Sequence, residues 1–124
     1  MLAALVDAAA GLYKHVVLDC GTTHLADPVV ESVDSVLLVV EASPVGIVRA
    51  AQLASTWFGP TPGVVVNKAT HANRAETIEA VRRWTGLDPV AVIPERQRVR
   101  RISAGGKPPD RAFARSLSRV SAAS

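Results

Sequence analysis

Residues 15–21 read His-Val-Val-Leu-Asp-Cys-Gly, and this stretch decides the fold that we predict for the whole chain. Its apolar residues follow one another without alternation, which is typical of a parallel strand buried on both faces. The run stops at Asp19, and Gly21 follows. A carboxylate at the carboxyl end of such a strand lies on the edge where open α/β sheets bind ligands. The alternative is that Asp19 only begins a loop or caps the next helix.

Further apolar runs predict strands at residues 35–40, 63–66 and 90–93. Strands that alternate with helices favour a parallel sheet built from right-handed βαβ crossovers. We therefore expect one α/β domain over residues 1–124, with three layers and a mostly parallel sheet of about four strands between flanking helices. The predicted helices cover residues 2–10, 27–31, 44–58, 73–84, 96–104 and 110–122.

Charge divides the chain into two parts. Residues 1–95 carry six Lys or Arg and ten Asp or Glu, a net charge of −4, whereas residues 96–124 carry eight and one, a net charge of +7. The single cysteine, Cys20, excludes an internal disulfide and is typical of a reducing compartment. No apolar run approaches the roughly 18 residues that span a bilayer. We expect a cytoplasmic protein with a basic C-terminal helical segment at 96–124.

Four landmarks stand in a fixed order along the chain. They are Tyr-Lys-His-Val-Val-Leu-Asp at 13–19, the strand at 36–40 followed by Glu41 and Ser43-Pro44, Val-Val-Val-Asn-Lys at 64–68, and Val-Ile-Pro-Glu at 92–95. In this order they resemble the C-terminal part of the ParA/MinD-like family of deviant P-loop ATPases, over residues 12–117. The resemblance implies a truncated P-loop NTPase-like fold and a place in the partitioning or positioning class, with ATP and Mg²⁺ as cofactors.

The resemblance also implies roles for individual residues. Asp19 would hold hydrated Mg²⁺, and Gly21 and Thr22 would begin the switch segment. Asn67 would contact adenine, because a side-chain amide offers a donor and an acceptor together. The alternative for Asn67 is an ordinary turn residue at the end of a strand. Pro94 and Glu95 would flank the base. Asp19 and Asn67 would then face one nucleotide from the same edge of the sheet.

The phosphate-binding loop of the family has no counterpart here. The only Gly-Gly-Lys, at 105–107, precedes two prolines, which lack the amide donors of a phosphate cradle. We therefore expect no ATP hydrolysis by this chain alone. The missing strand would come from a segment upstream or from a partner, including a second copy. Without it, the strands at 15–19 and 36–40 must pair directly, rearrange, or leave open edges that invite another chain.

The basic tail suggests a second class of function, a non-catalytic scaffold or interaction module. An arginine-rich helix face can bind nonspecific DNA or an acidic protein surface. A membrane is a weaker candidate because bulky apolar anchors are few. The alternative is a solvated face that keeps a small domain soluble. The candidate nucleic-acid-binding residues are Arg96, Arg98, Arg100, Arg101, Arg111, Arg115 and Arg119.

Overall fold

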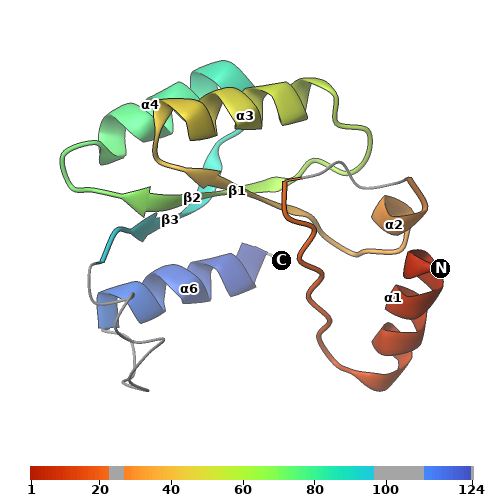
Figure 1. Ribbon diagram of the computed structural model, residues 1–124. Coiled ribbons are helices and arrows are strands. Elements are labelled where there is room, and N and C mark those ends of the chain that lie inside the picture. The colour runs from red at the N-terminus through yellow and green to blue at the C-terminus, as the bar shows by residue number, and fades with distance from the viewer. Residues whose placement is uncertain (23–26, 97–110, 124) are drawn as a thin grey trace.

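The computed structural model describes residues 1–22, 27–96 and 111–123. Its elements, drawn in Figure 1, are α1 (Leu2–Leu12), α2 (Asp27–Glu31), β1 (Leu37–Glu41), α3 (Pro44–Ser55), β2 (Gly63–Ala69), α4 (Arg74–Thr85), β3 (Pro89–Pro94) and α6 (Arg111–Ala123).

The strands form one parallel sheet in the order β1-β2-β3, as the alternation of strands and helices predicts. Helices α3 and α4 pack together on one face of this sheet, and α6 packs against β3 on the opposite face (Figure 1). Helices α1 and α2 contact each other beside the sheet. The α/β class and the flanking helices are therefore confirmed, with a smaller sheet than expected.

The core lies between the sheet and the α3–α4 layer. Val64 and Val66 of β2 and Val81 of α4 are completely buried, and Val40 of β1 packs with them. Val65, between the two β2 valines, is also buried, on the opposite face. This run is buried on both faces, as its lack of alternation predicts for a central parallel strand.

The strand predicted at 15–19 does not form, and this prediction was wrong. Residues 15–20 have no regular secondary structure, and Val17 is 93% exposed. Across the described ranges the sheet has three strands rather than about four. The physical reason is that an apolar run becomes a strand only when a neighbour satisfies its backbone groups. Figure 1 shows this segment leaving α1 as coil.

Two aromatic residues also depart from the prediction. Trp84 was expected on the apolar stripe of its helix, but it is exposed, while Val81 of the same helix is buried. Phe58 was expected at the end of a helix over 44–58, but α3 ends at Ser55 and Phe58 lies exposed in the following turn. The helix predicted at 96–104 lies outside the described residues, apart from Arg96.

Candidate functional site

The three parallel strands end at one edge of the sheet. Glu41 at the end of β1 is the register partner of Asn67 in β2, and the N–H of Ala42 donates to the Asn67 carbonyl at 2.8 Å. On the other side of β2, Pro94 is the register partner of Ala69, whose carbonyl accepts the N–H of Glu95 at 2.9 Å. The structure therefore brings Asn67, Pro94 and Glu95, three of the predicted site residues, to the same edge.

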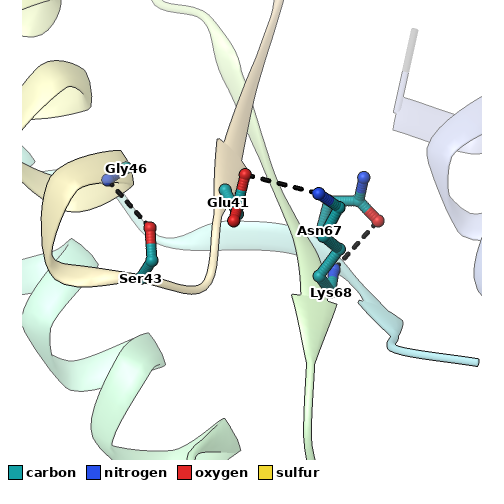
Figure 2. A network of polar contacts seen from close by, with 5 residues as sticks. All are labelled: Glu41, Ser43, Gly46, Asn67 and Lys68. Carbon is teal, nitrogen blue, oxygen red and sulfur yellow. Dashed lines mark hydrogen bonds and ion pairs between the residues drawn. The ribbon is translucent and has the colours of Figure 1, made fainter.

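The side chain of Asn67 is half-buried and turned toward its own strand end. Its Oδ1 accepts the backbone N–H of Lys68 at 2.9 Å (Figure 2). Within the described part of the chain no residue accepts a hydrogen bond from its Nδ2 group. A carbonyl oxygen has two lone pairs, so the amide keeps one acceptor position and both donors for a ligand.

Lys68 has a backbone conformation that a side chain rarely adopts. Its φ is +57°, and a register shift interrupts the pairing of β2 with β3 between Val66 and Ala69. Its Nζ lies 3.5 Å from Oε2 of Glu41 (Figure 2). Both side chains are more than half exposed, so this ion pair contributes little to stability. The sequence analysis gave Lys68 no role; only its place after Asn67 at the end of an apolar run pointed to it.

The turn from β1 into α3 fixes Glu41 at this edge. Ser43 begins the helix, and its Oγ accepts the Gly46 N–H at 3.1 Å (Figure 2). Pro44 occupies the first turn, where its missing N–H has no cost. A Cβ on Gly46 would overlap the backbone oxygen of Glu41, so only glycine allows the helix to start this close to the strand.

Asp19 lies in the coil between α1 and α2. Its Oδ1 accepts the N–H of Gly21 at 3.0 Å, and Gly21 has a φ of +61°. Asp19, Gly21 and Thr22 are all exposed. Among the described residues, no strand, hydrogen bond or ion pair connects Asp19 to Asn67. The observed carboxylate closes a local turn, which is the alternative reading of its sequence pattern.

The residues present do not fit the phosphates or the magnesium of a nucleotide. Residues 1–22, 27–96 and 111–123 contain no group of three His, Cys, Asp or Glu side chains that would hold a metal ion. Asp19 is a single carboxylate, and no glycine-rich strand-to-helix loop accompanies it in the sequence. The residues at the sheet edge fit a nucleotide base alone.

The arginines of α6 are solvent-exposed. Arg111, Arg115 and Arg119 recur every four residues, so they share one helix face. An open surface hollow is lined by Arg111, Ala114, Arg115 and Ser118. Arg96 is also exposed, at the end of β3. The other three predicted arginines, Arg98, Arg100 and Arg101, lie outside the described residues.

Comparisons with protein-family models, with curated proteins and with solved structures found no match to this chain. Within the described residues, each helix is too short or too polar to pass through a bilayer.

Proposed function

We propose that this chain is a ParA/MinD-like homologue of the partitioning or positioning class that recognises the adenine base of a nucleotide at the carboxyl edge of its sheet. The observation that carries the proposal is the position of Asn67. It ends the central parallel strand, on the edge where open α/β sheets bind ligands, and its amide retains free donors.

The neighbours of Asn67 support base recognition at this edge. Pro94 and Glu95 follow the adjacent strand and lie beside Ala69, two residues beyond Asn67. The Watson–Crick edge of adenine has one donor and one acceptor, which match the carbonyl oxygen and the NH₂ group of an asparagine. The strained backbone of Lys68 adds support, because residues held in rare conformations cluster at ligand-binding sites.

The proposal assigns no hydrolysis to this chain alone. The chain lacks a phosphate-binding loop, so a triphosphate would gain little affinity over the nucleoside. We therefore expect adenosine and ATP to bind with similar, weak affinity. A phosphate loop supplied by another polypeptide segment would raise the affinity for ATP far more than the affinity for adenosine.

The direct test compares ligands and variants. Inosine carries an oxygen in place of the adenine amino group, so the hydrogen-bonding pattern of its edge is reversed and it should bind more weakly. Asn67→Asp removes the NH₂ donors, and we expect it to weaken adenosine binding by about tenfold, the equivalent of one good hydrogen bond. Gln52→Glu, an exposed amide on α3, makes the same chemical change away from the edge and should leave binding unchanged.

If inosine binds as well as adenosine, or if Asn67→Asp binds adenosine normally, the base-recognition proposal is wrong. Circular dichroism of each variant verifies that its fold is intact. Equilibrium dialysis with millimolar ligand is suited to the weak affinity that we expect.

A second function, nonspecific binding of nucleic acid through α6, is favoured by the row of Arg111, Arg115 and Arg119. Four residues of α-helix rise about 6 Å, which is close to the spacing of phosphates along one strand of duplex DNA. All three guanidinium groups belong to exposed residues. The row therefore has the charge and the spacing to follow a phosphate backbone.

Salt dependence tests this second function. Replacing the three α6 arginines together with glutamine should reduce the slope of log affinity against log salt by up to about three phosphate contacts. The matched control replaces three exposed arginines of α4: Arg74, Arg82 and Arg83. If the two triple variants have equal slopes, α6 is not the binding surface.

A further inference from the structure

The outer edge of β1 carries unpaired backbone groups. The carbonyl of Val36 accepts the Gly63 N–H at 2.9 Å, and the N–H of Ala42 donates to Asn67, so both face β2. Backbone groups of successive residues in a strand face alternate sides. Leu37 and Val39 therefore direct their N–H and C=O groups away from β2. In the described part of the chain no strand lies on that side.

The sheet face next to this edge is also uncovered. Val39, Val65 and Ala91 are register partners across the three strands, on the face opposite the α3–α4 layer. Val65 and Ala91 are 2% and 3% exposed, whereas Val39 is 61% exposed. The cover on this face thus ends before β1.

The strand lacks the features that protect natural edges. Edge strands usually carry lysine, proline or a bulge, which prevents another strand from pairing. β1 reads Leu-Leu-Val-Val-Glu and has none of these, and its pairing with β2 is regular over all five residues. A regular apolar strand with an open edge is a template for strand addition.

Charge identifies the kind of strand that fits. Between Lys14 and Arg49 the chain has no Lys or Arg and five carboxylates: Asp19, Asp27, Glu31, Asp34 and Glu41. Pairing β1 with β1 of a second copy would bring two of these acidic stretches together, and like charges directly opposed across strands are destabilising. A basic segment would instead gain favourable charge interactions at the same edge.

We propose that the outer edge of β1 binds an extended, basic segment of another polypeptide, which adds to the sheet as a fourth strand. The segment pairs with the backbone of Leu37 and Val39 and covers the side chain of Val39. Its lysines or arginines face the carboxylates that flank β1. This interaction does not require nucleotide binding, so either proposal can fail without the other.

The experiment titrates the ¹⁵N-labelled full chain with a synthetic peptide of alternating valine and threonine that carries two lysines at each end. Hydrogen exchange is measured amide by amide. With free peptide at ten times its Kd, exchange at Leu37 and Val39 should slow by roughly tenfold. Exchange at Leu38 and Val40, whose N–H groups already face β2, should change little.

Two variants and a second peptide control the experiment. Val39→Lys should weaken peptide binding by about tenfold or more, because it adds an edge-protecting charge. Val90→Lys, the matched change at an exposed valine of the other outer strand, should not. Unchanged exchange at Val64 and Val66 shows that each variant keeps its core. A peptide with glutamates in place of its lysines should bind to the unaltered chain far more weakly.

Three results would overturn the proposal. The first is no slowing at Leu37 and Val39 with millimolar peptide. The second is equal binding of the lysine and glutamate peptides. The third is slow exchange at Leu37 and Val39 without peptide, together with a dimer in sedimentation, which would assign the edge to a second copy.

Discussion

The Nζ of Lys68 lies 3.5 Å from Oε2 of Glu41 and joins the ends of two neighbouring parallel strands beside Asn67. The ion pair is exposed and weak, so it does not account for the positive φ of Lys68. The strained backbone is better explained by the geometry of the strand end, where the Asn67 side chain accepts the Lys68 N–H and the pairing with β3 shifts.

Lys68→Gly and Lys68→Ala should therefore differ in stability. Both variants lose the ion pair, but only glycine adopts a φ of +57° without strain. We expect the free energy of unfolding of Lys68→Gly to exceed that of Lys68→Ala by about 1 kcal/mol. Urea denaturation measures the difference. Equal stabilities would show that this residue is not strained in solution.

Gly46→Ala should destabilise the domain by about 1 to 3 kcal/mol, because the new methyl group would meet the backbone oxygen of Glu41. Gly11→Ala on α1 is the control, since an added Cβ there meets no atom within 4 Å. Alanine is the better helix former, so this control should not lose stability. If Gly46→Ala were as stable as the unaltered chain, the close approach of α3 to β1 would be wrong.

Val81→Ala should cost about 2 kcal/mol or more in the free energy of unfolding, because Val81 is fully buried between α4 and the sheet. Val48→Ala, at an exposed position of α3, should stay within about 0.5 kcal/mol of the unaltered chain. Thermal and urea unfolding of the two variants compares them directly. Similar losses would contradict the packing of α4 on the sheet.

Local patterns were sufficient to predict most elements of the fold. The apolar runs at 35–40, 63–66 and 90–93 became β1, β2 and β3, within a few residues at each end. Local signals also placed helix boundaries, such as Ser43-Pro44 at the start of α3 and Gly86, with a φ of +74°, at the end of α4. These signals act through nearby backbone groups, so the sequence alone reveals them.

The missing strand at 15–19 depends on something that no local pattern contains. Val16 and Val17 have the composition of a buried strand, but a strand also requires a neighbour to accept its hydrogen bonds. In the structure these valines are exposed, and β1 keeps an open edge. The edge residues Asn67, Pro94 and Glu95 were predicted together because their strands do have neighbours. Asp19 was misplaced because its strand does not.

The measurement that tests the central claim most directly is a titration of the ¹⁵N-labelled chain with adenosine, followed by amide chemical shifts. Base recognition at the carboxyl edge predicts saturable shifts that concentrate at Asn67, Lys68 and Glu95, and that diminish in Asn67→Asp. Shifts confined to α6 or to the coil around Asp19, or none at millimolar adenosine, would contradict the account.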